Sequence, residues 1–306
     1  MSMSSVSTAS PSRLALASAF AIVYVIWGST FLAILFAIQT LPPFLMASTR
    51  FLIAGAVLYA WSRMRGAAAP GRAEWRATAA IGLLLLLGGN GLLVWSEQRI
   101  PSGVAALLVG TVPCFMALID WLRPGGVRPS GHVVAGLLLG LVGLVWLVGP
   151  DALMGGGRVD FIGATAVVVA SFSWAVGSIY SRHASTPASP FLSTAMQMLA
   201  GGVVLLLLSV LLGEPWGFDL SAVSLRSALG LLYLIVFGSI VAFSAYIWLL
   251  RVSTPARVST YAYVNPVVAV FLGWALAGEA LTARIGVAAA IIVSGVALIT
   301  LSPKRA

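Results

Sequence analysis

Aromatic and hydroxyl side chains lie inside apolar stretches of this sequence, where they could bind a small molecule without covalent chemistry. Tyr24, Trp27 and Phe31 stand at positions i, i+3 and i+7 of one stretch, so a helix would place them on one face. Thr30 lies beside them. Aromatic rings stack on apolar groups, and hydroxyl groups hydrogen-bond to polar ones. Because polar groups are penalised where a helix faces lipid, we expect this face to point into the protein.

The same reasoning selects candidate substrate-binding residues in other apolar stretches. Helix packing remains an equal alternative for Trp27 and Trp174, and a hydrogen bond between helices remains one for Asn90 and Asn265. The predicted set is Tyr24, Trp27, Thr30, Asn90, Trp95, Trp174, Ser178, Ser244, Tyr246, Tyr261 and Asn265.

Four further residues are predicted to have structural or gating roles. Arg50 is the one charged residue well inside an apolar stretch, and Gln197 is its counterpart 147 positions later. Arg50 could meet a substrate carboxylate or could bond backbone carbonyl groups, and we favour the structural role. Pro113 and Pro266 occupy matching positions in two stretches. Because proline removes a backbone hydrogen bond and kinks a helix, both are predicted to be hinges.

The ionisable residues limit the mechanism. All eight Asp and Glu residues, and both His residues, lie at or near the ends of the apolar stretches. A proton-coupled carrier usually relays protons through a buried carboxylate or histidine. An enzyme would need clustered acids, histidines or nucleophiles, and a channel would need rings of charge. We therefore predict facilitated movement of a neutral or zwitterionic solute, with no catalytic residue, metal or cofactor.

The composition identifies the elements that must position these residues. Hydrophobic residues make up 60% of the 306 positions, charged residues make up 8%, and the mean hydropathy is +1.05. A soluble domain carries about 25% charged residues, so a soluble enzyme and a disordered chain are excluded. The single cysteine excludes a disulfide framework. An all-α integral membrane protein remains.

Ten apolar stretches are long enough to cross a bilayer as helices. The first is too long for the core of a signal peptide, so we expect it to be retained. The predicted spans are 14–38, 42–62, 77–96, 102–121, 132–149, 159–181, 190–212, 225–249, 256–277 and 282–301.

Basic residues predict the orientation of these spans. Twelve of the 17 Lys and Arg residues fall in segments on one side of the membrane and four on the other, with Arg50 inside a span. Lys and Arg accumulate on the cytoplasmic side, so both termini are predicted to be cytoplasmic. The pI of about 10.6 is then a consequence of topology and does not indicate nucleic-acid binding.

The second half of the chain repeats features of the first, at offsets that rise from 147 to 153. This pattern predicts two five-helix repeats, residues 1–153 and 154–306. An odd number of spans inverts the second repeat, and inverted repeats around a central cavity are typical of alternating-access transporters. The matched residues are Trp27 with Trp174, Pro43 with Pro190, Gly88 with Gly238, Arg99 with Arg251, and Pro113 with Pro266.

Several motifs resemble the drug/metabolite transporter superfamily in its EamA-type branch, and in particular the YddG-like group of amino-acid exporters. The resemblance covers essentially the whole chain. It rests on the five-plus-five spans and on Trp27–Thr30, Leu41–Pro43, Arg50, Trp95–Gly103, Pro113, Pro266 and Gly278–Glu279.

This resemblance implies that the first, third, fourth, sixth, eighth and ninth spans surround a central cavity, with the fifth and tenth at the periphery. It also implies export of amino acids or similar small metabolites across a bacterial-type inner membrane. The alternatives are a multidrug or nucleobase exporter of the same fold and an integral-membrane enzyme. We expect the lipid bilayer and a small-molecule substrate as partners, no nucleic acid, and function as a monomer.

Overall fold

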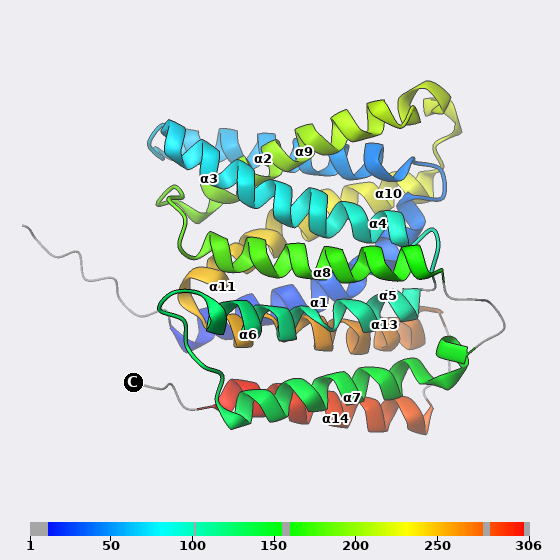
Figure 1. Cartoon of the computed structure of the whole chain (residues 1–306). Helices are drawn as coiled ribbons and strands as arrows, with labels where there is room; N and C mark the ends of the chain where they lie inside the picture. The colour runs from blue at the N-terminus through cyan, green and yellow to red at the C-terminus, as the bar shows by residue number, and fades with distance from the viewer. Residues whose placement is uncertain (1–11, 101, 155–159, 278–281, 303–306) are drawn as a thin grey trace, which may run out of the picture.

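The computed structural model describes residues 12–100, 102–154, 160–277 and 282–302, and regular structure within these residues is entirely helical (Figure 1). Gly278 and Glu279 of the family motif lie outside the described residues. The first half contains α1 (Arg13–Ala37), α2 (Pro43–Met64), α3 (Arg72–Gly82), η1 (Leu83–Gly91), α4 (Leu92–Ser96), α5 (Ser102–Val109), α6 (Val112–Leu122) and α7 (Gly131–Met154).

The second half repeats this order with short extra helices in its loops. It contains α8 (Phe161–Ser181), α9 (Pro190–Leu211), η2 (Glu214–Gly217), η3 (Leu220–Ala222), α10 (Leu225–Tyr233), η4 (Leu234–Phe243), α11 (Ser244–Val252), α12 (Pro255–Val258), α13 (Tyr261–Ala277) and α14 (Ala283–Leu301).

The predicted fold class is confirmed. Over the described residues, nine helical runs are long and apolar enough to cross a membrane, and one of them has a turn at Gly110 and Thr111 between α5 and α6. Helix α13 supplies the tenth span and is described over 17 residues. Two of the runs are composite, because α3, η1 and α4 join end to end, as do α10, η4 and α11.

Both composite runs contain a π-helical segment, which the apolar pattern does not predict. Segments η1 and η4 occupy matching places in the two halves and include the repeat-related pair Gly88 and Gly238. A π-helix bonds each amide to the carbonyl five residues earlier and frequently occurs at functional sites. Hydropathy measures only how apolar a stretch is, so it cannot distinguish this ladder from an α-helical one.

The two matching prolines differ in their helical context. The predicted span 102–121 is broken at Gly110 and Thr111, and Pro113 lies in the first turn of α6. Proline is accepted there because the first amides of a helix have no partner within it. Pro266 instead lies inside α13, which continues on both sides of it.

Two pairs of equivalent helices pack at opposite ends of the molecule, α2 with α9 and α7 with α14 (Figure 1). Helices α7 and α14 approach so closely at Gly136 that a Cβ on this residue would lie 2.6 Å from the carbonyl oxygen of Gly295. Glycine at this position therefore permits the contact. Helix α2 has no side-chain cap of its own. The Glu214 carboxylate caps it instead, by accepting the amides of Phe44 at 3.2 Å and Leu45 at 2.7 Å.

Helix α3 begins five residues before the predicted span. The Gly71 amide donates to the Glu74 carboxylate at 2.7 Å. An acidic residue in the first turn stabilises a helix start, so the polar Arg72–Arg76 segment becomes helical although it is not apolar.

Candidate functional site

A cavity of about 100 Å³ lies between the two halves of the protein. Its described lining comes from seven of the ten spans and includes none of α7, α9 or α14. The lining residues are Trp27, Thr30, Phe31, Ile34, Arg50, Phe51, Leu86, Gly89, Asn90, Leu93, Val109, Val112, Ala170, Ser171, Trp174, Gly238, Phe243, Tyr261 and Asn265.

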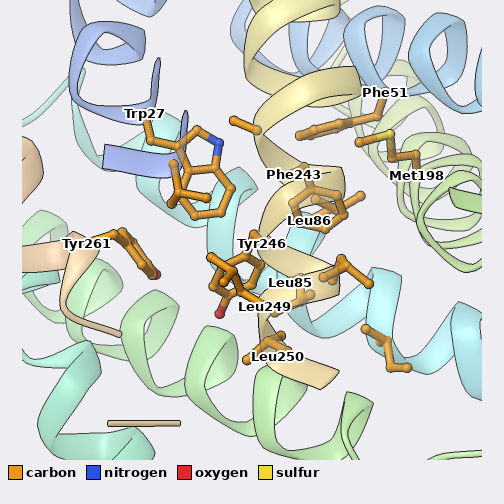
Figure 2. Close-up of a cluster of buried hydrophobic side chains, with 14 of the residues drawn as sticks. Trp27, Phe51, Leu85, Leu86, Met198, Phe243, Tyr246, Leu249, Leu250 and Tyr261 are labelled. Carbon is orange, nitrogen blue, oxygen red and sulfur yellow. The ribbon is translucent and has the colours of Figure 1, made fainter. Parts of the chain in front are cut away.

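One wall of the cavity belongs to an aromatic cluster of Trp27, Trp174, Phe243, Tyr246 and Tyr261, of which all but Tyr246 line the cavity. The ring centroid of Trp27 lies 5.0 Å from that of Tyr246, 5.0 Å from that of Tyr261 and 5.7 Å from that of Trp174. Figure 2 shows Trp27 and Tyr261 converging on the helix that carries Phe243 and Tyr246. Rings at these separations attract one another in edge-to-face and tilted geometries, so the wall is a rigid apolar surface.

Tyr246 forms the layer behind this wall. Its side chain is fully buried and does not line the cavity. The Tyr246 hydroxyl accepts a hydrogen bond from Trp174 Nε1 at 2.9 Å and lies 2.6 Å from Ser178 Oγ. Tyr246 and Ser178 are therefore placed to fix the orientation of the Trp174 ring.

Segment η4 lies at the edge of the cavity and is held by two side chains of the first half. Trp27 Nε1 donates to the carbonyl oxygen of Gly238 at 3.2 Å, and Arg50 Nε donates to Ser239 Oγ at 2.7 Å. The guanidinium of Arg50 also lies 4.8 Å from the ring centroid of Phe51. Helices α1 and α2 of the first half thus hold the π-helical segment of the second half through polar contacts at the edge of the cavity.

Two asparagines complete the polar lining. The Asn90 side-chain oxygen is buried and has no hydrogen-bond partner within the described ranges. Asn265 is satisfied when its amide nitrogen donates to the carbonyl oxygens of Tyr261 at 3.0 Å and Tyr24 at 3.2 Å. The hydrogen bond between helices that was one alternative for Asn265 is therefore present, and Asn90 makes no such bond to a described residue.

Six predicted binding residues line the cavity, namely Trp27, Thr30, Asn90, Trp174, Tyr261 and Asn265. Arg50, predicted to be structural, has both a structural contact and a place in the lining.

The other predicted residues do not line the cavity. Tyr24 hydrogen-bonds Thr260, and Trp95 stacks against Arg99 with 4.4 Å between the guanidinium carbon and the ring centroid. Ser244 is buried, with no partner for its hydroxyl among the described residues. Gln197 donates to Ser193 Oγ at 3.1 Å. Tyr246, Ser178, Pro113 and Pro266 are also absent from the lining.

Several lining residues were not in the predicted set. Phe31 carries a signal in the sequence, because it follows Trp27 by one helical turn. Phe51 follows Arg50 directly, and Phe243 lies three residues before Tyr246. Phenylalanine in an apolar stretch is also typical of an ordinary core residue, so the sequence does not mark these two as lining residues. Only the geometry of η4 distinguishes Gly238, whose backbone carbonyl is used.

Charge in the described lining is confined to Arg50. The part of the chain that the structure describes contains no group of three or more His, Cys, Asp or Glu residues able to hold a metal ion. With aromatic rings, amides, hydroxyl groups and one cation, the cavity can bind a small polar molecule non-covalently.

A half-buried carboxyl group, with one oxygen atom fully buried, lies outside the cavity at the end of the third span. Glu97 directly follows α4, and its Oε1 atom has no hydrogen-bond partner among the residues described. Burial raises the pKa of Glu97 to about 7 because the charged form is poorly solvated there. The protonation of the Glu97 carboxyl group can therefore change near neutral pH.

Comparisons with known proteins agree with this architecture. The chain is 41% identical over 280 residues to the "Uncharacterized inner membrane transporter YedA" of Escherichia coli K12, covering 91% of this chain and 88% of the relative. It is 25% identical to the "Uncharacterized transporter YoaV" of Bacillus subtilis, covering 92% and 96%. It is 26% identical to the Arabidopsis thaliana "WAT1-related protein At3g02690, chloroplastic", covering 89% and 66%.

A solved structure with 24% sequence identity shares the fold with a TM-score of 0.77, covering 95% of this chain and 98% of its own. A model of the EamA-like transporter family matches residues 14–149 and 161–301. The chain therefore belongs to the EamA-like transporter family.

Proposed function

We propose that this protein is a secondary transporter that exports amino acids or similar small metabolites across the bacterial inner membrane by alternating access. The observation that carries the proposal is the cavity between the two halves, with an aromatic wall on one side and Arg50 and Asn90 among its polar lining. These groups suit a molecule with both an apolar side chain and charged or polar ends. The export direction rests on the resemblance to bacterial exporters.

The size of the cavity supports a mechanism with moving helices. Sites for small molecules usually enclose about 300–1,000 Å³. The described cavity of about 100 Å³ is smaller, so a substrate requires the surrounding helices to separate. Transporters with inverted repeats achieve this by moving one bundle against the other around a site near the membrane centre.

The charge distribution supports facilitated movement without proton exchange. The described lining contains neither a carboxylate nor a histidine that could relay a proton. Purified protein in proteoliposomes should therefore carry labelled amino acids down their own gradient, with saturation and without an imposed pH gradient. Flux that requires a pH gradient would contradict facilitated movement.

The same assay separates the alternative substrates. Unlabelled amino acids should compete with the labelled one, whereas purines and cationic dyes should not. Competition by purines or dyes alone would favour the nucleobase or multidrug exporter of the same fold. The absence of saturable flux for every amino acid in the panel would overturn the proposal.

Topology and assembly are part of the same proposal. The excess of basic residues on one side supports cytoplasmic termini in the inner membrane. A reporter that works only in the cytoplasm should be active when it is fused to either terminus, and a reporter that works only outside the cytoplasm should be inactive there. We also propose that the monomer is functional, so reconstitution at one protein per vesicle should preserve flux.

A further inference from the structure

Arg50 retains unused hydrogen-bonding capacity although its side chain is only 5% exposed. Its Nε atom donates to Ser239, and neither Nη1 nor Nη2 donates a hydrogen bond to any residue in the described ranges. No acidic residue belongs to the described lining around it. Burying a cation without a counter-ion costs free energy. An anion that pairs with Nη1 and Nη2 would lower this cost, so these atoms form a strong site for an anion.

The contact with Ser239 engages only Nε and leaves Nη1 and Nη2 of the guanidinium available to a ligand. Arginine binds carboxylates through two parallel N–H groups. Because Nε is already engaged, the Nη1 and Nη2 pair is the fork that remains. Ser239 and the Phe51 ring hold the group in place, and such preorganisation lowers the entropy lost on binding.

Asn90 supplies the complementary group in the same lining. Its buried side-chain oxygen lacks a donor among the described residues, and an unpaired buried acceptor also costs free energy. A ligand that donates from one group and accepts at another would satisfy both residues. An α-amino acid has this combination, with an ammonium group and a carboxylate on one carbon atom.

We infer that Arg50 binds the substrate carboxylate and Asn90 accepts a hydrogen bond from the substrate ammonium group, with the substrate side chain against the aromatic cluster. This inference rests on the proposed function and specifies its substrate chemistry. It predicts selection against amines, because they lack the carboxylate and bring a positive charge towards Arg50.

The first test uses the wild-type protein in proteoliposomes and needs no variant. The probe is labelled L-phenylalanine or, if another amino acid of the panel moves faster, that amino acid. Its amide, its decarboxylated amine and its deaminated acid serve as competitors. We expect the amide and the amine to compete at least about tenfold more weakly than the amino acid, because each leaves Arg50 unpaired.

The second test assigns the groups to residues. Arg50→Gln should abolish the discrimination between the amino acid and its amide, and Arg50→Lys should restore part of it. Asn90→Leu should reduce the discrimination between the amino acid and its deaminated acid. Arg226→Gln is the matched control, since Arg226 is exposed and stacks on Phe36 outside the cavity.

The outcomes separate the two proposals. No amino-acid flux in the wild-type protein overturns both. Amino-acid flux with equal competition by the amide and the amine overturns the inference and leaves the proposed function standing. If Arg50→Gln remains monodisperse and lowers flux while the preference for the amino acid over its amide is unchanged, Arg50 is structural and the inference fails.

Discussion

The two π-helical segments occupy matching places in the repeats but are held in different ways. Segment η1 packs on α8, where Ser173 Oγ donates to the Leu84 carbonyl oxygen at 2.8 Å and glycines allow close approach. Segment η4 is held by the long side chains of Trp27 and Arg50, which also line the cavity. Both segments line the cavity, η1 through Leu86, Gly89 and Asn90 and η4 through Gly238 and Phe243. We infer that Gly88 in η1 serves to pack the fold, whereas its counterpart Gly238 in η4 is part of the site.

The repeat-related glycines provide the strongest test of this difference. A Cβ on Gly88 would lie 2.2 Å from Ser173 Oγ and 3.0 Å from Ser173 Cβ, so Gly88→Ala must displace Ser173. A Cβ on Gly238 would meet Arg50 Nη2 at 3.0 Å, and the end of a long side chain can move. Overpacking costs about 1–3 kcal/mol, so we expect Gly88→Ala to lower thermal stability most.

Gly238→Ala should affect transport more than stability. Its added methyl group disturbs Arg50 at the cavity edge, so flux should fall while the unfolding temperature in detergent changes little. Measuring both quantities for both variants tests the comparison. Equal losses of stability in the two variants would contradict it.

The two tryptophans give the next largest effect. Trp27→Phe leaves the Gly238 carbonyl oxygen without its side-chain donor, whereas after Trp174→Phe the Tyr246 hydroxyl keeps Ser178. Both substitutions remove the same atoms, so their difference isolates the contact with η4. We expect Trp27→Phe to be less stable by about 1 kcal/mol. Denaturation curves that coincide would show that the contact contributes nothing.

The matching prolines test whether the halves also differ as hinges. Pro266 interrupts the hydrogen-bond ladder inside α13, whereas Pro113 lies where a helix start needs no donor. Pro266→Ala should stiffen α13 and slow substrate flux severalfold. Pro113→Ala should change flux less than twofold, as read from initial rates at saturating substrate. A larger effect at Pro113 would place the hinge in the first half.

The smallest effect concerns Glu97, whose counterpart at the offset of 152 is the buried Leu249. Its pKa is raised from 4.5 to about 7, so the folded state binds the proton more tightly than the unfolded state. Its contribution to stability is fully present below pH 4.5 and is lost as the pH rises through 7. Unfolding temperatures from pH 4.5 to 8 should fall more in the wild-type protein than in Glu97→Leu. If the unfolding temperatures of the two proteins change in parallel with pH, the Glu97 carboxyl group does not contribute to the pH dependence of stability.

The sequence predicts the membrane fold well because each span needs only a long apolar stretch. It also predicts which side chains face inward, because the polar groups of Trp27, Asn90 and Asn265 would be penalised in lipid. Polarity does not reveal which layer a side chain occupies, so Tyr246 was grouped with the lining although it lies behind Trp174. The cap by Glu214 joins residues 169 positions apart, so no local pattern encodes it.

The position of Arg50 has an electrical consequence. Arg50 carries the charge of the described lining, and its side chain, which comes from α2, is held by Ser239 of η4. A zwitterionic cargo adds no net charge to this assembly, so the membrane potential does no work on the cargo as it crosses. A cationic cargo would gain or lose about 2.3 kcal/mol for each 100 mV. Under the proposed function, flux of a zwitterion should therefore follow its concentration gradient at any voltage and should leave the membrane potential unchanged.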